Sequence, residues 1–189
     1  MSTRGKTLNL TAVILAGGRS SRMGTSKALL PMNGQRLIDR TRSILNELAP
    51  RIQQVVVSGS VPETDFIPDV VPFRGPVGGI ASAAKELISG GTDGLLVVPV
   101  DLPLLTPEAL LPLITFFRKE KPSAVCFQES WLPAIFQLNE NLISQCERNR
   151  SIHSLLVNLD FDSLAISDPK ALTNANTPEE WARFTGSSL

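Results

Sequence analysis

Short apolar runs alternate with longer amphipathic stretches along the chain, and the two patterns predict different elements. Residues 10–16, LTAVILA, form a continuous apolar run that is typical of a strand buried on both faces of a sheet. Similar runs recur further along the chain and predict further strands. The expected strands are residues 10–16, 51–59, 68–72, 94–100, 123–127 and 132–138.

The stretches between these runs carry apolar residues at helical spacing, and two of them also carry helix start signals. Thr106 is placed to cap a helix whose first residue is Pro107. Thr177 and Glu180 have the spacing of a capping box. The expected helices are residues 35–48, 76–88, 106–119, 140–149, 151–159 and 177–184.

Alternation of strands and helices through the first half predicts a parallel sheet covered by helices. The chain has 189 residues, a length that favours one domain. We find no repeat, no low-complexity tract and no linker, because the Gly-Pro-rich stretch at 72–79 is too short to be one. The sequence therefore predicts a single three-layer α/β domain over residues 1–189.

Composition narrows the class of protein. Lys plus Arg and Asp plus Glu both number 18, and this zero net charge argues against general nucleic-acid binding. Cys126 and Cys146 are too few for a disulfide framework or a zinc site, so we expect two reduced thiols. The amino terminus has no apolar signal core, and no run reaches the roughly 18 apolar residues of a membrane span. We expect a cytoplasmic protein without a membrane or nucleic-acid partner.

A glycine-rich, positively charged loop directly follows the first expected strand. In LAGGRSSRMGTSKALL (15–30), Gly17 and Gly18 can present backbone N–H groups to a phosphate, and Arg22 and Lys27 add charge. The loop lies where open parallel sheets bind ligands, at the carboxyl end of a strand. The spacing fits neither a Walker loop, which needs Gly-Lys before Ser or Thr, nor a G-x-G-x-x-G fingerprint.

Asp101 directly follows the apolar strand 94–100, at the strand end where a ligand would lie. A carboxylate there suits Mg²⁺, which takes one or two carboxylates in addition to phosphate oxygens and water. The alternative is an Asp that caps a turn before Leu102 and Pro103. We predict that Asp101 is the metal ligand and that Mg²⁺ is the cofactor.

Taken together, the motifs resemble those of a known family. LAGGRSSRMGTSKALL resembles the signature of nucleotidyltransferases that join a nucleoside triphosphate to a phosphorylated acceptor and release pyrophosphate. Within that superfamily the chain is most similar to the molybdenum cofactor guanylyltransferases, and the resemblance extends over nearly the whole length. The further segments that carry it are RGPVGGIASA (74–83), LLVVPVDLPLL (95–105), RNRSIHSLLVNL (148–159) and LTNANTPEEWARF (172–184).

The resemblance implies a Rossmann-like nucleotidyltransferase fold with a mostly parallel sheet. It also implies transfer of GMP from GTP to the phosphate of molybdenum-molybdopterin, with a nucleotide half at about 8–105 and an acceptor half at about 106–189. Transient contact with other cofactor-biosynthesis proteins or molybdoenzymes would fit this role. The implied site residues are catalytic Arg22, Lys27 and Asp101; nucleotide-binding Leu15, Ala16, Gly17, Gly18, Lys27, Ser58 and Asp101; and acceptor-binding Gly75, Gly79, Asn174 and Asn176.

Departures from the family pattern leave alternatives open. Ser26, not Asp, precedes Lys27, and Ser58 and Pro72 stand where relatives place an Asn and an Asp near the base and ribose. Asp69 is close by but out of register in this alignment. We therefore expect weaker base selectivity, and a cytidylyltransferase acting on molybdopterin or on a sugar or polyol phosphate remains an alternative, as does a non-catalytic nucleotide-binding relative.

Several of these residues also have a purely structural interpretation. Gly75 and Gly79 could serve helix-to-sheet packing, and Asn174 and Asn176 could order a turn before the last helix. We expect a structural or merely ligand-proximal role for His153, because a phosphate acceptor needs no general base.

Overall fold

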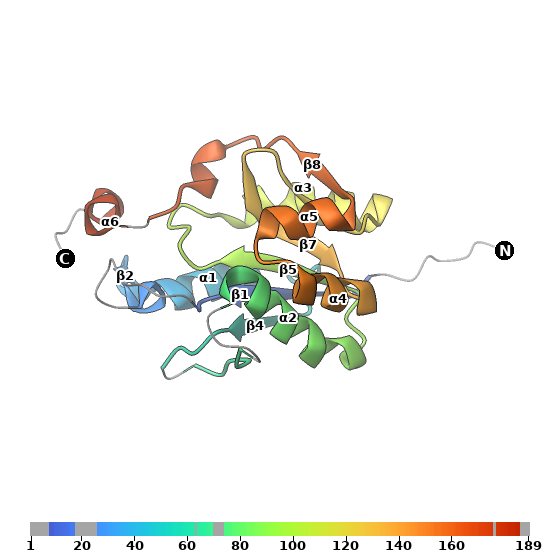
Figure 1. Cartoon of the computed structure of the whole chain (residues 1–189). Helices are drawn as coiled ribbons and strands as arrows, with labels where there is room; N and C mark the ends of the chain where they lie inside the picture. The colour runs from blue at the N-terminus through green and yellow to red at the C-terminus, as the bar shows by residue number, and fades with distance from the viewer. Residues whose placement is uncertain (1–7, 18–25, 63, 70–73, 176, 186–189) are drawn as a thin grey trace.

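One six-stranded sheet crosses the molecule and joins the two halves of the chain (Figure 1). The computed structural model describes residues 8–17, 26–62, 64–69, 74–175 and 177–185. The strand order is β4-β1-β5-β7-β6-β8, and β7 is the one strand that runs antiparallel to its neighbours. The strands are β1 Leu10–Leu15, β4 Gln54–Ser58, β5 Gly94–Pro99, β6 Ala124–Phe127, β7 Ser130–Gln137 and β8 Phe161–Leu164.

The register of the three strands in the first half aligns their carboxyl ends. Leu15, the last residue of β1, lies opposite Ser58 of β4 and Pro99 of β5. The residues that follow these strands therefore emerge at the same edge of the sheet, which is the edge where open α/β sheets bind ligands. The loop after β1, the turn after β4 and Asp101 after β5 all belong to this edge.

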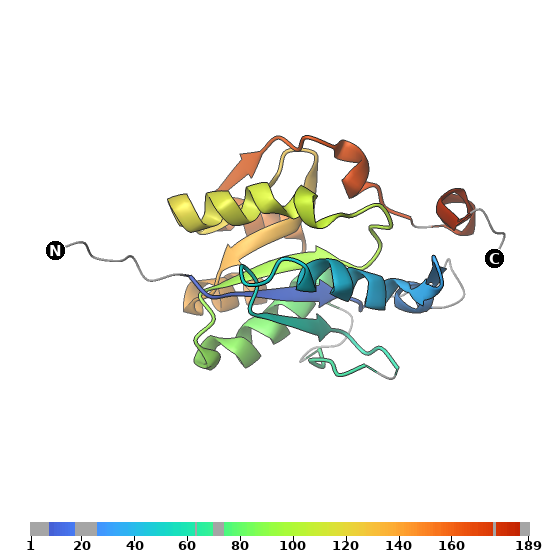
Figure 2. The ribbon, with the colours of Figure 1, turned by 180° about the vertical axis from the view of Figure 1, so that it is seen from behind.

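Helices cover both faces of the sheet, because side chains alternate between the faces along each strand. In β1, Ala12 and Ile14 pack in one apolar cluster while Val13 and Leu15 pack in the other. One face is covered by α1 Leu37–Asn46 and α3 Pro107–Glu120, and Trp181 of α6 Pro178–Thr185 belongs to the same apolar cluster. The other is covered by α2 Gly75–Leu87, α4 Glu140–Arg148 and α5 Ile152–Leu159. Figure 1 shows α2, α4 and α5 in front, and Figure 2, from behind, shows α1 and α3.

The predicted helix starts are confirmed. Thr106 Oγ1 accepts from the N–H of Ala109 at 3.4 Å. Thr177 Oγ1 accepts from Glu180 N at 3.2 Å while Glu180 Oε2 accepts from Thr177 N at 3.3 Å, which is the reciprocal pattern of a capping box. Short elements complete the fold: the hairpin strands β2 Pro31–Met32 and β3 Gln35–Arg36, and single 3₁₀ turns at Lys27–Leu29, Ile88–Gly90 and Pro169–Leu172.

All six expected helices are present, and so are five of the six expected strands. Pro68 and Asp69 belong to no strand, and the rest of that expected strand lies outside the described residues. The sequence did not predict β8 or the antiparallel direction of β7. The three-layer α/β fold with a mostly parallel sheet is confirmed. Within the described part of the chain, no helix has the length and apolar character needed to cross a bilayer.

Candidate active site

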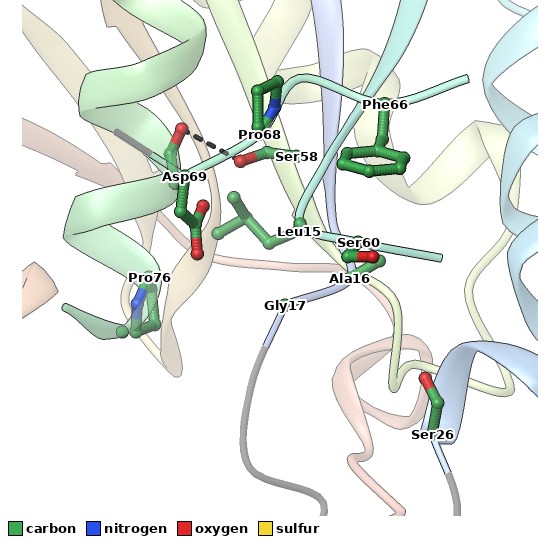
Figure 3. Close-up of a pocket in the computed structure, with 13 residues that line it drawn as sticks. Leu15, Ala16, Gly17, Ser26, Ser58, Ser60, Phe66, Pro68, Asp69 and Pro76 are labelled. Atoms are coloured by element: carbon green, nitrogen blue, oxygen red, sulfur yellow. Dashed lines mark hydrogen bonds between the residues drawn. The ribbon is translucent and has the colours of Figure 1, made fainter. Parts of the chain in front are cut away.

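A cavity of about 770 Å³ opens at the carboxyl edge of β1 and β4 (Figure 3). Its wall comes from segments that are distant in the sequence and that the fold brings together. These are residues 15–17 after β1, residues 58–60 after β4, Phe66, Pro68 and Asp69 in the following segment, Gly75, Pro76 and Gly79 at the start of α2, and Ser26. The predicted nucleotide residues Leu15, Ala16, Gly17 and Ser58 therefore line one cavity, and the predicted acceptor residues Gly75 and Gly79 line it too.

Two glycines let the β1 and β4 chains approach closely at the cavity. Gly59 has φ +99°, and a Cβ there would lie 2.5 Å from the Cα of Gly17. Ala16 N donates to Ser58 O at 2.9 Å and ties the two segments together. A side chain at position 59 would displace the backbone of Gly17, and both glycines line the cavity, so Gly59 belongs to the site. The sequence did not single it out.

Gly79 allows α2 to lie directly on the ends of β1 and β4. A Cβ on Gly79 would lie 2.8 Å from Ser58 Oγ and 2.9 Å from Leu15 Cδ2. Ser58 is almost fully buried, and its Oγ donates to Gly79 O at 3.1 Å. The close contact favours the packing interpretation of Gly79, and the acceptor-binding role stays a prediction. Gly75, by contrast, begins α2 with φ +65°, and a Cβ there would meet nothing within 4 Å.

An acidic side chain is present in the cavity wall. Asp69 lines the cavity, and a Cβ on Gly17 would lie 3.6 Å from its Oδ2. Burial raises the pKa of the Asp69 carboxyl above its ordinary value. The backbone of Ile67 forms a parallel bridge with Ser58, which fixes this segment beside β4. Asp69 therefore supplies an acidic side chain at the cavity, which the expectation of weaker base selectivity had taken to be absent. Base selectivity itself stays a prediction, and Pro72 lies outside the described residues.

Lys27 and Asp101 meet beside the cavity although 74 positions separate them. Lys27 Nζ donates to Asp101 Oδ2 at 2.9 Å, and the side chains are 18% and 21% exposed. Lys27 is thus an ion-paired, half-buried residue that opens a 3₁₀ turn, not a solvated loop lysine. Asp101 O also accepts from Ala175 N at 3.1 Å, so the segment that carries Asn174 contacts the end of β5.

Other predicted residues have different outcomes. Gly18, Arg22 and Asn176 lie outside the described residues. Asn174 is exposed next to the contact between Ala175 and Asp101. The ring of His153 contacts that of Trp131 at a tilt of 40°, with centroids 4.7 Å apart, and no contact among the described residues joins His153 to Asp101 or Lys27.

One arginine joins the cavity wall to the second half of the chain. Arg74 precedes α2, and its Nη2 donates to the carbonyls of Glu147 at 2.9 Å, Cys146 at 3.3 Å and Asn149 at 3.4 Å. These carbonyls lie at the end of α4, where a guanidinium also interacts favourably with the helix dipole. Arg74 therefore has a structural role next to Gly75, and the glycine pattern of the sequence motif did not reveal it.

The residues at this edge suit a magnesium ion that arrives with phosphates. Among the described residues no three His, Cys, Asp or Glu side chains cluster as a protein-only metal site. Asp101 provides a partly exposed carboxylate, which pairs with the ammonium group of Lys27. One carboxylate with phosphate oxygens and water is a usual Mg²⁺ environment.

Comparison with known proteins places the fold and these motifs in a family. Residues 12–160 match the family described as MobA-like NTP transferase domain. The chain is 37% identical to a molybdenum cofactor guanylyltransferase from Xanthomonas euvesicatoria, over 92% of this chain and 93% of that protein. It is 35% identical to a probable molybdenum cofactor guanylyltransferase from Rhodopirellula baltica, over 90% and 89%.

Solved structures share the fold at lower identity. Molybdopterin-guanine dinucleotide biosynthesis protein A from Archaeoglobus fulgidus superposes with a TM-score of 0.74 at 22% identity, over 93% of this chain and 97% of that one. A nucleotidyl transferase from Methanothermobacter superposes with a TM-score of 0.70 at 20% identity, over 96% and 97%. The family resemblance expected from the sequence motifs is thus confirmed: the chain is a nucleotidyltransferase and belongs to the MobA-like NTP transferase family.

Proposed function

We propose that this enzyme transfers GMP from GTP to the terminal phosphate of molybdenum-molybdopterin, giving the guanine dinucleotide cofactor and pyrophosphate. The observation that carries the proposal is the cavity in which residues 15–17 and Asp69 lie beside the Lys27–Asp101 pair. The two guanylyltransferase relatives, which align with about nine-tenths of the chain, support the choice of substrates.

Guanine offers two kinds of donor, its ring N–H and its exocyclic amine. A carboxylate such as that of Asp69 accepts from such donors or from ribose hydroxyls, and backbone carbonyls of residues 15–17 would accept in the same way. Polar groups that a bound base covers also discriminate against bases that leave them unpaired, at about 1–3 kcal/mol for each group. We therefore propose a clear preference for GTP over CTP and ATP.

The chemistry needs positioning and charge neutralisation more than proton transfer. An oxygen of the acceptor phosphate attacks the α-phosphorus in line, the new P–O bond forms, and the bond to the β-phosphate breaks with its electrons on the leaving pyrophosphate. The attacking oxygen is already ionised, so no general base is required. Lys27 would neutralise the α-phosphate, and Gly17, Gly18 and Arg22 would hold the triphosphate.

Asp101 would hold the magnesium ion between the nucleotide and the acceptor. When bound, Mg²⁺ supplies Lewis-acid stabilisation of the phosphates. To release its carboxylate for this role, Asp101 must exchange its contact with Lys27, whose Nζ then donates to a phosphate oxygen. We propose that Asn174, carried by the segment that contacts Asp101, binds the acceptor together with Asn176.

Pyrophosphate release tests the proposal. The purified protein is incubated with Mg²⁺, with GTP or CTP, and with molybdenum cofactor or a sugar phosphate as acceptor. We expect release to require GTP and molybdenum cofactor together. A preference for CTP would replace the guanylyltransferase with a cytidylyltransferase, a preference for the sugar phosphate would replace the acceptor, and no release with any pair would contradict the proposal.

A further inference from the structure

Phe66 is a large apolar side chain that is exposed inside the cavity. It is 40% exposed and belongs to the cavity wall together with Pro68 and Asp69. Leu104, Trp131 and Val157 are similarly exposed in the described part of the chain, but none of them lines the cavity. A phenyl ring that is exposed in an open cavity leaves apolar surface in water unless a ligand covers it.

The backbone around Phe66 is fixed. Ile67 N donates to Val57 O at 2.7 Å, and Ile67 O accepts from Gly59 N at 3.2 Å. These bonds attach the segment to the end of β4 as a short parallel bridge. Ile67 packs against the apolar cluster on the α2 face, while Phe66 and Pro68 line the cavity. The ring is therefore held at the cavity by a hydrogen-bonded backbone.

The wall offers two different surfaces to a ligand. Figure 3 shows the ring of Phe66 on one side of the view and the carboxylate of Asp69 on the other, with Leu15 between them. One surface is flat and apolar, and the other is a carboxylate next to the backbone of Gly17. A nucleobase matches both, because it has an aromatic face and a hydrogen-bonding edge.

We propose that Phe66 is the stacking surface for the nucleobase. The proposal deepens the proposed function and rests on it. The base lies with its face against the phenyl ring and its polar edge toward residues 15–17 and Asp69. Stacking is indifferent to the donor and acceptor pattern of the base, so Phe66 contributes affinity and the polar groups contribute selectivity. A purine covers more of the ring than a pyrimidine and gains more from it.

Equilibrium binding separates base contacts from phosphate contacts. Calorimetry in Mg²⁺ buffer compares GTP, CTP and tripolyphosphate, which has no base, on the wild type, Phe66→Ala and Phe66→Tyr. Trp131→Ala is the matched control, since Trp131 is an equally exposed aromatic residue outside the cavity. Thermal melting confirms that each variant is folded.

We expect Phe66→Ala to weaken GTP binding about tenfold to a hundredfold, from the usual contribution of base–aromatic stacking. The loss for CTP should be smaller, and tripolyphosphate should bind unchanged. Phe66→Tyr and Trp131→Ala should bind GTP like the wild type. An equal loss for GTP and tripolyphosphate would indicate a distorted loop and overturn the inference.

The two proposals fail in different ways. Unchanged GTP affinity in Phe66→Ala removes Phe66 from base binding and leaves GMP transfer standing. A wild type that prefers CTP, and loses that affinity in Phe66→Ala, contradicts the guanylyltransferase assignment but supports the stacking role. A wild type that binds neither triphosphate contradicts both.

Discussion

Replacing Gly79 with alanine tests whether this glycine serves packing or ligand contact. The added Cβ would lie 2.8 Å from Ser58 Oγ and 2.9 Å from Leu15 Cδ2, both closer than a Cβ normally comes to any other heavy atom. Either α2 moves away from the strands, or Ser58 and Leu15 change rotamer. If Ser58 rotates, its hydrogen bond to Gly79 O is lost.

The expected cost follows from three contributions. Overpacking of this kind costs about 1–3 kcal/mol. The lost hydrogen bond of Ser58 adds about 1 kcal/mol if the side chain rotates. Alanine in place of glycine within a helix returns about 1 kcal/mol. We expect a net destabilisation of about 1–3 kcal/mol, which for a chain of this size lowers Tm by roughly 2–12 °C.

Thermal denaturation and GTP binding are measured on Gly79→Ala, with Gly90→Ala as the matched control. A Cβ on Gly90 meets nothing within 4 Å, and its φ is outside the left-handed region, so that variant should be as stable as the wild type or slightly more stable. Adding Ser58→Ala to Gly79→Ala removes the oxygen contact and should restore part of the lost stability. Wild-type stability in Gly79→Ala would refute the packing argument, and if GTP binding were nevertheless lost, Gly79 would be a ligand contact.

Three further predictions concern charges at the site. Asp101→Asn should reduce turnover at least about a hundredfold and abolish the dependence of turnover on Mg²⁺, because an amide keeps the shape of the side chain without its charge. If turnover of the variant depended on Mg²⁺ concentration as in the wild type, Asp101 would be a turn residue. Lys27→Met should reduce turnover about 10²–10³-fold, with a change in Tm of a few degrees. Lys85→Met breaks an exposed ion pair and should leave turnover unchanged. If Lys27→Met turned over as fast as Lys85→Met, Lys27 would be excluded from catalysis. Burial raises the pKa of Asp69 and the ionised form is the acceptor, so GTP affinity should fall as pH drops through that raised pKa. Asp69→Asn should remove this loss of GTP affinity at low pH and should reduce the ratio of GTP affinity to CTP affinity. If the pH dependence of GTP affinity were the same in Asp69→Asn as in the wild type, Asp69 would not bind the base.

Local patterns predicted the elements well because each pattern has a local cause. Continuous apolar runs gave β1 and β5, whose side chains are buried on both faces. The start of α3 was predictable because the cap of Thr106 depends only on its own sequence neighbourhood. β8, whose sequence is FDSL, lies at the edge of the sheet and is only partly buried, so no apolar run marks it.

Long-range geometry was predictable only where a general rule applied. The rule that ligands bind at the carboxyl ends of parallel strands correctly brought Lys27 and Asp101 to one edge. No comparable rule gives the register of an irregular segment. Asp69 reaches the cavity because Ile67 bridges to Ser58, and Gly59 matters because the Gly17 backbone crosses it. Neither contact leaves a periodic signal in the sequence.

The antiparallel strand also has a consequence for the site. Because β7 runs opposite to β5, its first residues lie at the same edge as Asp101, and the hairpin to β6 brings the second half of the chain to that edge. The C-terminal segment then returns, and Ala175 N donates to Asp101 O. On the opposite face of the sheet, the hydrogen bond from Arg74 to the carbonyl of Glu147 joins the start of α2 to the end of α4. The segment with Asn174 therefore meets Asp101 at the edge of the sheet where the cavity opens, an arrangement that the proposed in-line transfer between two bound phosphates would require.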